Sequence, residues 1–278
     1  MRCKRCDNDL LTNLCFIYKS NLSKAAIVNK QEIQLPGRRV LITGGARGLG
    51  AAFAHAAVAA GARVVISDVL HERGQQTAAA LGSAAQFIAM DVADSGSVKA
   101  GVRQAVAWLG GMDALINNAA ITNSGGKEMA QISEATFDQV MAVNVKGTWL
   151  VTCAAHEHLK ASGSGRVLNI ASDTALWGAP RLMAYVASKG AVMAMTHSMA
   201  RELGVDEITV NAIAPGLTLG EATQYIPQER HDAYRNGRAI GREQMPSDVT
   251  AAALFLISSA AGFITGQVLP VNGGFVMQ

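Results

Sequence analysis

The chain is 278 residues long, 50% of them hydrophobic and 16% charged, with a formal net charge of +3 at pH 7. This length and hydrophobic content suffice to bury one α/β core in a single domain. The positive charge is mild and forms no basic stripe interleaved with aromatic residues, so nucleic acid is excluded as an expected partner. No apolar run reaches the ~20 residues that span a bilayer, so we expect a soluble protein without a membrane partner.

Residues 1–34 differ in texture from the rest of the chain, being rich in Asn, Lys and Cys. We expect a flexible N-terminal extension there and one globular domain over residues 35–278. Cys3 and Cys6 have the spacing of half a zinc site, but no second pair follows, and we predict no metal. The basic start suggests a secretory leader, although nearby acidic residues and the lack of a cleavage site argue against one. Cys153 is the single cysteine of the domain, which favours a cytoplasmic protein over a disulfide framework.

The domain opens with a strand, a glycine-rich turn and a helix in immediate succession. Residues 38–43 are a short branched apolar run, and residues 51–60 form an Ala-rich helical segment. The glycines between them allow a tight turn and a close approach to a pyrophosphate, whose charge is met by amide groups at the helix N-terminus. Because the turn lies between a strand and a helix, it predicts a dinucleotide site. We assign to this site the turn residues Gly44, Arg47, Gly48, Leu49 and Gly50.

A second expected strand, over residues 62–67, is followed at once by Asp68. A carboxylate at this place accepts hydrogen bonds from the ribose hydroxyls of an adenosine and repels a 2′-phosphate. Arg47 argues in the opposite direction, because a guanidinium pairs well with such a phosphate. We give Asp68 more weight because it is placed to contact the ribose directly, and we predict NAD rather than NADP as the cofactor.

Further helices and strands alternate along the rest of the chain. The patterns predict strands over residues 85–90, 112–116, 166–170, 208–213 and 266–274, and helices over residues 71–81, 95–109, 133–160, 184–203 and 247–258. Residues 217–241 have no clear core periodicity and are long for a connection, which is typical of a lid. The alternation predicts an α/β fold with a single doubly wound parallel sheet of about seven strands and helices on both faces.

Three polar side chains near the strand 166–170 and the helix after it form a candidate catalytic group. Tyr185 and Lys189 are four residues apart, so they share a face of that helix. A nearby ammonium favours the phenolate of a tyrosine, whose unperturbed pKa is about 10. Ser172 follows the buried strand, and its hydroxyl can hydrogen-bond a substrate oxygen. Together the three residues supply a donor, an acid/base and a tuning charge.

The Thr-Gly-x-x-x-Gly-x-Gly spacing and the pattern of Ser172, Tyr185 and Lys189 resemble the short-chain dehydrogenase/reductase family over residues 35–278. The resemblance implies a Rossmann fold and one dinucleotide-binding catalytic domain. It implies that Asn144 maintains a proton relay through a water next to Lys189. It also implies cofactor contacts from Asp91, Val92, Asn118, Tyr185, Lys189, Pro215, Gly216 and Thr218.

Two positions depart from the family pattern. Ala120 stands where the family has a glycine after Asn-Asn-Ala, which narrows that spot slightly. Gly220 stands where a threonine is common, so we expect the contact with the nicotinamide carboxamide at Thr218.

The inferred function is NAD-dependent interconversion of a secondary alcohol and its ketone, with Tyr185 as the acid/base. An NADPH-dependent reductase of 3-oxoacyl carriers is an alternative within enzymes, although Asp68 counts against it. A non-catalytic nucleotide-sensing regulator on the same fold is the alternative from another class. The presence of both Tyr185 and Lys189 argues against that regulator.

The substrate and the assembly are less strongly indicated. Leu176, Trp177 and Met183 favour an apolar small-molecule alcohol or ketone as the substrate. Helices 133–160 and 184–203 carry more small and apolar residues than one sheet face needs, and family members commonly pair these helices. We therefore expect a homo-oligomer, either a tetramer or a dimer.

Overall fold

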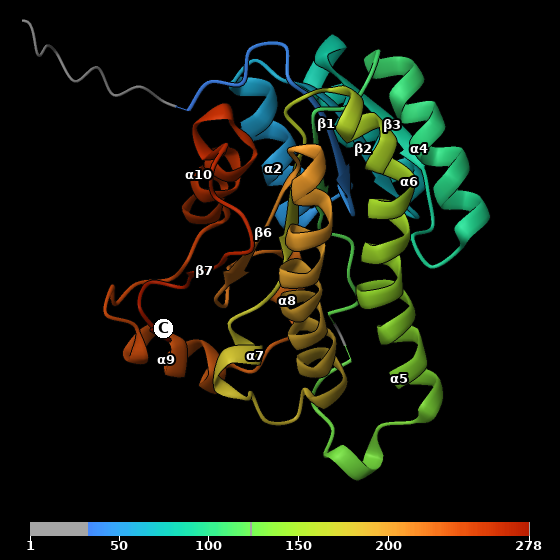
Figure 1. Cartoon of the computed structure of the whole chain (residues 1–278). Helices are drawn as coiled ribbons and strands as arrows, with labels where there is room; N and C mark the ends of the chain where they lie inside the picture. The colour runs from blue at the N-terminus through green and yellow to red at the C-terminus, as the bar shows by residue number, and fades with distance from the viewer. Residues whose placement is uncertain (1–32, 123, 278) are drawn as a thin grey trace, which may run out of the picture. The chain divides into compact units, whose positions relative to one another are not determined.

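The strands of the domain form one parallel seven-stranded sheet in the order β3-β2-β1-β4-β5-β6-β7 (Figure 1). The computed structural model describes residues 33–122 and 124–277, so the expected extension and its Cys3 and Cys6 lie outside the described residues, apart from positions 33 and 34. The strands are β1 (Arg39–Thr43), β2 (Arg63–Asp68), β3 (Ala85–Ala89), β4 (Ala114–Asn117), β5 (Arg166–Ile170), β6 (Thr209–Pro215) and β7 (Val268–Val271). The predicted doubly wound sheet is confirmed, with its reversal of strand order between β1 and β4.

Helices cover both faces of the sheet, as predicted. One face carries α2 (Gly48–Ala59), α3 (His71–Leu81) and α10 (Pro246–Ile257), with α2 packed directly against α10 (Figure 1). The other carries α4 (Ser95–Leu109), α5 (Glu134–Met141), α6 (Thr148–Ala161) and α8 (Met183–Leu203). Shorter elements are η1 (Gly82–Ala84), η2 (Met129–Gln131), η3 (Ala142–Gly147), α7 (Thr174–Trp177), η4 (Gly204–Asp206), η5 (Glu221–Thr223), α9 (Gln228–Gly237) and η6 (Ser259–Ala261).

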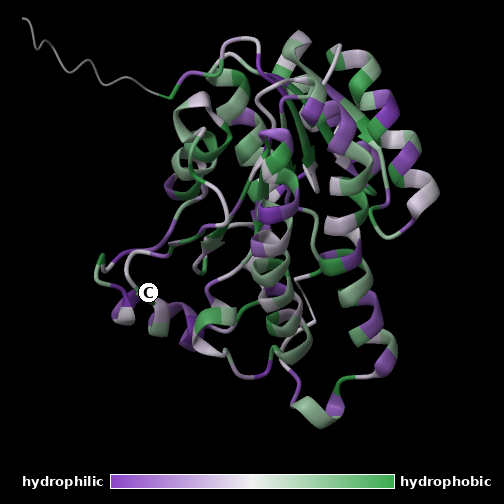
Figure 2. Cartoon of the chain, in the orientation of Figure 1, coloured by the Kyte–Doolittle hydropathy of each residue, from purple (hydrophilic) through white to green (hydrophobic). Residues whose placement is uncertain are grey.

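The central strands are buried along their whole length, because helices shield both faces of the sheet. Every residue of β4, β5 and β6 is buried. Such strands read as continuous apolar runs rather than as an alternation of apolar and polar residues. Figure 2 shows this as hydrophobic colour along the inner strands. An extensive apolar cluster lies between the sheet and the helices α4, α6 and α8.

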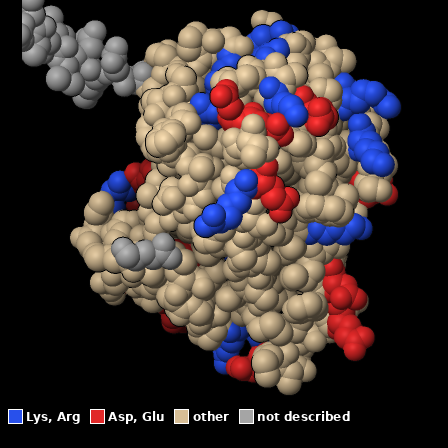
Figure 3. Space-filling model, in the orientation of Figure 1, with Lys and Arg blue, Asp and Glu red and all other residues tan. Residues whose placement is uncertain are grey.

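Within residues 33–122 and 124–277, no helix combines the length and the apolar character needed to cross a bilayer. Figure 3 shows basic and acidic side chains intermingled over one face of the molecule.

The prediction of one continuous helix over residues 133–160 is wrong in one respect. A π-helical turn, η3 (Ala142–Gly147), separates α5 from α6. Its Asn144 side chain accepts a hydrogen bond from the Ile121 backbone N–H at 2.7 Å and donates to the Ile121 carbonyl at 3.2 Å. A wider turn of this kind commonly marks a functional position within a helix. Sequence periodicity alone does not reveal it, because the residues on either side remain helical.

The segment 217–241 contains more regular structure than its sequence indicates. Residues Glu221–Thr223 form η5, and Gln228–Gly237 form the helix α9. Tyr234 is the one buried residue of α9. A helix with so narrow an apolar face gives little periodic signal.

A close helix-to-strand contact provides a test of this packing. Gly74 of α3 lies so near β3 that an added Cβ would approach Phe87 Cε2 to 2.1 Å. Gly74→Ala should therefore lower the free energy of unfolding by ~1–3 kcal/mol, because backbone or ring must shift. Gly204→Ala is the matched control, since nothing lies within 4 Å of its added Cβ. Urea denaturation gives the free energy of unfolding of both variants. Equal values for the two variants would contradict this packing.

Candidate active site

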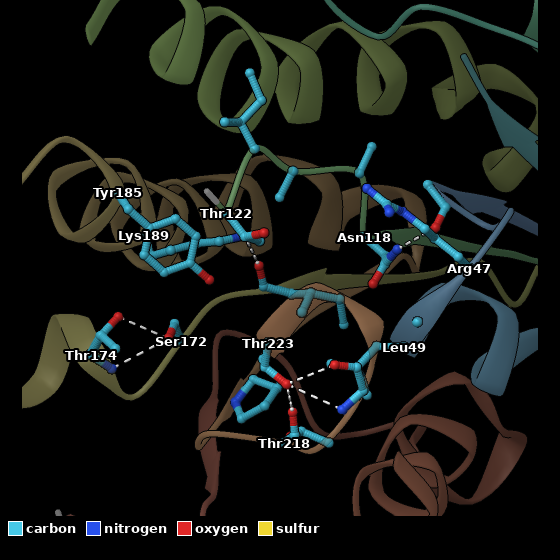
Figure 4. A pocket seen from close by; sticks show the side chains of 18 of the residues that line it. Arg47, Leu49, Asn118, Thr122, Ser172, Thr174, Tyr185, Lys189, Thr218 and Thr223 are labelled. Carbon is cyan, nitrogen blue, oxygen red and sulfur yellow. Dashed lines mark hydrogen bonds between the residues drawn. The ribbon is translucent and has the colours of Figure 1, made fainter. Parts of the chain in front are cut away.

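A pocket of about 550 Å³ opens at the carboxyl ends of the parallel strands (Figure 4). Ligands of doubly wound folds bind at this edge of the sheet. All but two of the residues expected in the site line it. They are Gly44, Arg47, Gly48, Leu49, Asp68, Asp91, Val92, Asn118, Ser172, Tyr185, Lys189, Pro215, Gly216 and Thr218. The remaining two, Gly50 and Asn144, lie behind this lining.

The glycine turn between β1 and α2 needs its glycines for two different reasons. Gly44 and Gly48 have φ angles of +64° and +58°, which side chains disfavour. At position 50 a glycine is required because the backbone of Gly44 lies too close for a side chain. A Cβ added to Gly50 would lie 2.1 Å from the carbonyl oxygen of Gly44. The turn therefore brings backbone amides and the N-terminus of α2 to the pocket at positions where the glycines carry no side chain. This cradle fits the pyrophosphate of a dinucleotide.

Asn118 holds this turn in place rather than pointing freely into the pocket. Its Nδ2 donates to the carbonyl oxygens of Thr43 at 3.0 Å and Gly44 at 2.8 Å. Its backbone N–H donates to Thr43 Oγ1 at 3.0 Å. Asn118 thus joins the end of β4 to the end of β1, which explains the value of an asparagine at this strand end.

Asp68 is the last residue of β2, and its carboxylate is already ordered by the backbone around it. Oδ2 accepts a hydrogen bond from Ala46 N–H at 3.1 Å, and Oδ1 accepts one from Leu70 N–H at 3.1 Å. Carboxylate oxygens have further acceptor capacity. The residue therefore has both the position and the free lone pairs that ribose hydroxyls require.

The Arg47 guanidinium, which the sequence suggested as a partner for a 2′-phosphate, is paired with an acidic side chain. Its Nη1 forms an ion pair with Glu221 Oε1 at 2.9 Å, and Arg73 approaches the other carboxylate oxygen of Glu221 at 3.3 Å. Glu221 belongs to the segment 217–241. One carboxylate thus pairs with two guanidinium groups, and Arg47 is engaged by Glu221, which weakens the sequence argument that Arg47 serves to bind a phosphate.

The three candidate catalytic side chains meet in the same pocket, with Ser172 opposite Tyr185 and Lys189 (Figure 4). Ser172 Oγ accepts hydrogen bonds from Thr174 Oγ1 at 2.8 Å and from Thr174 N–H at 3.3 Å. An acceptor role toward Thr174 leaves the Ser172 proton available for a substrate oxygen. Thr174 is a partner that sequence reasoning did not identify.

Burial dominates the acid–base properties of Tyr185 and Lys189. Desolvation raises the pKa of Tyr185 to about 12, with smaller contributions in the same direction from Tyr225 and Asp173 and an opposing one from Ser172. Desolvation also lowers the pKa of Lys189 to about 8. The Lys189 ammonium lies 5.7 Å from the centre of the Tyr185 ring. Burial is thus the largest influence on the Tyr185 pKa in this structure, and the expectation that Lys189 depresses that pKa stays a prediction.

Lys189 and Asn144 are linked through neighbouring groups. Lys189 Nζ donates to the carbonyl oxygen of Ile170 at 2.7 Å. Asn144 Nδ2 donates to Ser188 Oγ at 3.0 Å, and Ser188 precedes Lys189 on α8. Asn144 thus ties η3 to the helix that carries Tyr185, and its role in a proton relay stays a prediction.

The chain after β6 forms the opposite wall of the pocket. Thr218 Oγ1 donates to the carbonyl oxygen of Gly216 at 3.1 Å, and the Thr218 carbonyl accepts from Thr223 Oγ1 at 2.8 Å (Figure 4). These contacts fold the loop back on itself beside Pro215. Thr218 is buried at the pocket wall, and its contact with a carboxamide stays a prediction.

Several further residues line the pocket without having been assigned individual roles from the sequence, although four of them belong to the segment 217–241 that was expected to be a lid. They are Asp173, Leu182, Tyr225, Ile226, Arg230 and Tyr234. Asp173 directly follows Ser172, so its position in the chain was a usable signal. The residues of the segment 217–241 reach the pocket only through long-range folding.

The expectation of an apolar substrate was based on three residues that do not line the pocket in the structure. Among the described lining residues, neither Leu176, Trp177 nor Met183 occurs. Leu176 packs on a small core cluster, Trp177 contacts Tyr234, and Met183 is exposed. The argument for an apolar substrate from these three residues is therefore wrong.

Residues 33–122 and 124–277 contain no candidate metal site. No group of three or more His, Cys, Asp or Glu side chains there is arranged to hold an ion.

Comparisons with known proteins agree on one family. A family model described as enoyl-(acyl carrier protein) reductase matches residues 44–276. A 3-alpha-(or 20-beta)-hydroxysteroid dehydrogenase of Mycobacterium tuberculosis (strain ATCC 25618 / H37Rv) is 37% identical over 243 residues, covering 87% of this chain and 91% of that protein. A 2,5-dichloro-2,5-cyclohexadiene-1,4-diol dehydrogenase of Sphingobium indicum is 36% identical over 247 residues, covering 87% and 98%.

Solved structures are similar over almost the whole domain. A 3-ketoacyl-(acyl-carrier-protein) reductase from Brucella melitensis, complexed with NADH, has a TM-score of 0.82 at 33% identity, covering 87% of this chain and 99% of its own. A putative short-chain alcohol dehydrogenase from Sinorhizobium meliloti 1021 has a TM-score of 0.82 at 32% identity, covering 88% and 98%.

The buried ammonium of Lys189 leads to a stability prediction. Its pKa falls from 10.5 to about 8 on folding, so the unfolded chain binds more protons between these values and stability rises with pH there. Below about pH 8 the charged group opposes folding. Lys189→Met keeps the length but removes the charge, and should raise the free energy of unfolding at pH 7 by ~1–3 kcal/mol.

The measurement is urea unfolding at pH 7, 9 and 10.5, and the difference between variant and parent should shrink as the pH rises. Lys99→Met, at an exposed position of α4, is the matched control and should show no such trend. A stability gain of equal size at every pH would contradict this account of Lys189.

Proposed function

This chain belongs to the short-chain dehydrogenase/reductase family, and we propose that within it the protein interconverts a secondary alcohol and its ketone by NAD-dependent hydride transfer. The relatives already make it an oxidoreductase that acts on alcohols or ketones. The observation that carries the finer proposal is the presence of Ser172, Tyr185 and Lys189 in one pocket with the glycine turn and Asp68.

The residues present fit a nicotinamide dinucleotide. The glycine turn and the N-terminus of α2 would hold the pyrophosphate, Asp68 would bind the adenosine ribose, and Lys189 would bind the nicotinamide ribose. The loop Pro215–Thr218 would hold the carboxamide. When bound, the nicotinamide supplies the hydride acceptor or donor.

The chain itself handles the proton and orients the substrate. Ser172 donates its hydroxyl proton to the substrate oxygen, because Thr174 occupies its acceptor side. Tyr185 exchanges the proton of the reacting hydroxyl at its Oη. Since its pKa is raised to about 12, the phenol is protonated at neutral pH and is ready to act as an acid toward a ketone. Alcohol oxidation needs the phenolate and should therefore accelerate as the pH rises.

Two substrate classes are supported, a secondary alcohol with its ketone and a 3-oxoacyl thioester. The relatives named above act on a steroid and on a cyclic diol, which supports a secondary alcohol. The Brucella protein and the matching family model are named as acyl-carrier reductases, which supports the alternative of a 3-oxoacyl substrate. A panel of alcohols, ketones and a 3-oxoacyl thioester, followed by nicotinamide absorbance with each cofactor, separates them.

Tyr185 provides the decisive mutational test. Tyr185→Phe keeps the ring and its packing but removes the only atom that takes the proton in this mechanism. Oxidation should fall by ~10²–10⁴-fold, while the affinity for NAD, measured by calorimetry, stays unchanged. A variant that kept a tenth or more of the parent rate would show that Tyr185 is a packing residue.

Cofactor preference provides a second test. Asp68→Ser should lower the ratio of kcat/KM for NAD to that for NADP, because it removes the carboxylate that repels a 2′-phosphate. Glu221→Gln should shift the ratio in the same direction by releasing Arg47 and Arg73. Glu229→Gln, also in the segment 217–241, is the control. If the parent enzyme already preferred NADP, the Asp68 argument would be wrong.

A further inference from the structure

The residue after Ser172 is a buried carboxylate that the proposed reaction does not use. Asp173 is 0% exposed, and its Oδ1 accepts a hydrogen bond from Tyr234 Oη at 2.7 Å. Its Oδ2 is buried without a hydrogen-bond partner among the described residues. Isolated buried carboxylates are costly, and such groups usually serve a purpose that offsets the cost.

The backbone of Asp173 connects three parts of the site. Its N–H donates to the Pro215 carbonyl at 3.0 Å, at the end of β6. Its carbonyl accepts from Leu176 N–H at 2.8 Å, within α7. Since Ser172 is the adjacent residue, any shift of Asp173 also moves the Ser172 hydroxyl.

Tyr234 brings helix α9 to this point. Its hydroxyl accepts a hydrogen bond from Trp177 Nε1 at 3.2 Å while donating to Asp173. Its ring stacks on Phe275 with centroids 4.2 Å apart. The single buried side chain of α9 is therefore held by α7, by the segment before the C-terminus and by the Asp173 carboxylate.

A second contact holds α9 on the same loop. Arg230 Nη2 donates to the Pro180 carbonyl at 3.0 Å, and its guanidinium lies 5.8 Å from the centre of the Trp177 ring. Both Arg230 and Tyr234 line the pocket. Helix α9 thus forms part of the pocket wall and is attached to residues 173–180 by these contacts.

We infer that Asp173 is a positioning residue: by accepting the hydrogen bond from Tyr234, it locks α9 against residues 173–180 at the pocket wall. The inference rests on the proposed function, because it assigns Asp173 a role in that reaction. It follows from the hydrogen bonds that join Asp173, Tyr234 and Trp177.

The charged and titratable groups around Asp173 support an ionised carboxylate in the assay range. Burial raises the pKa of Asp173 to about 6, opposed by the hydrogen bond from Tyr234 and by the positive charge of Arg238. Asp173 is therefore anionic above about pH 6. Its charge raises the pKa of Tyr185, to a smaller extent than burial does.

Two variants test the lock. Asp173→Asn keeps an oxygen that accepts the hydrogen bond from Tyr234, so KM for the alcohol should stay within about twofold of the parent value. Tyr234→Phe removes the donor of that hydrogen bond, so KM should rise about tenfold. Asp206→Asn is the matched control, because Asp206 lies outside the pocket lining and pairs with His156 and Lys160.

Limited trypsin digestion adds a readout that needs no substrate. With NAD present, Tyr234→Phe should be cleaved at Arg230 and Arg235 at least about fivefold faster than the parent or Asp206→Asn, because α9 detaches more often. Asp173→Asn should digest like the parent. Circular dichroism and thermal melting confirm that each variant is folded.

The outcomes distinguish this inference from the proposed function. A parent enzyme that oxidises no alcohol with NAD refutes the proposed function, and the digestion then decides the lock alone. An active parent with unchanged KM and digestion in Tyr234→Phe refutes the lock. An Asp173→Asn variant that is digested as fast as Tyr234→Phe refutes the role of the Asp173 oxygen as the acceptor in the lock.

Discussion

The hydrogen bond from the buried ammonium of Lys189 to the carbonyl of Ile170 is the contact on which the site depends. It attaches α8 to the last residue of β5. The phenol of Tyr185 lies one helical turn before Lys189, and Ser172 lies two residues after Ile170, so one contact sets their separation. Removing the carbonyl partner from a buried ammonium is strongly unfavourable. The lowered pKa of Lys189 indicates that placing this charge in the core lowers the stability of the fold at neutral pH.

A polar network behind the site keeps the same elements in register. Asn117 Nδ2 donates to Asn169 Oδ1 at 2.9 Å and to Thr152 Oγ1 at 3.0 Å, and Asn169 Nδ2 donates to Thr196 Oγ1 at 2.9 Å. These contacts join β4 and β5 to α6 and α8 within an otherwise apolar core. Buried polar groups that find their partners favour one arrangement over its neighbours. The strand ends that carry Asn118 and Ser172 are therefore held in place from within the core as well as at the pocket.

The two ends of the pocket are built in different ways. The cofactor end uses short stretches of chain at strand ends, such as the glycine turn and Asp68, whose geometry is largely local. The substrate end depends on contacts between distant segments, such as the Tyr225 hydroxyl that donates to the Thr122 carbonyl at 2.6 Å. A lid assembled in this way can change its lining without disturbing the sheet, because few of its side chains take part in the core.

The sequence by itself determined the parallel α/β sheet, the glycine turn and the Ser172, Tyr185 and Lys189 group, because each depends on short-range spacing and on strands buried from both sides. It did not reveal the π turn at Asn144, since periodicity persists through it. The direction of the Tyr185 pKa shift was decided only by the tertiary structure, because desolvation depends on every atom that excludes water. The same holds for Asp173, whose partner Tyr234 is 61 residues away in the chain and meets it only after folding.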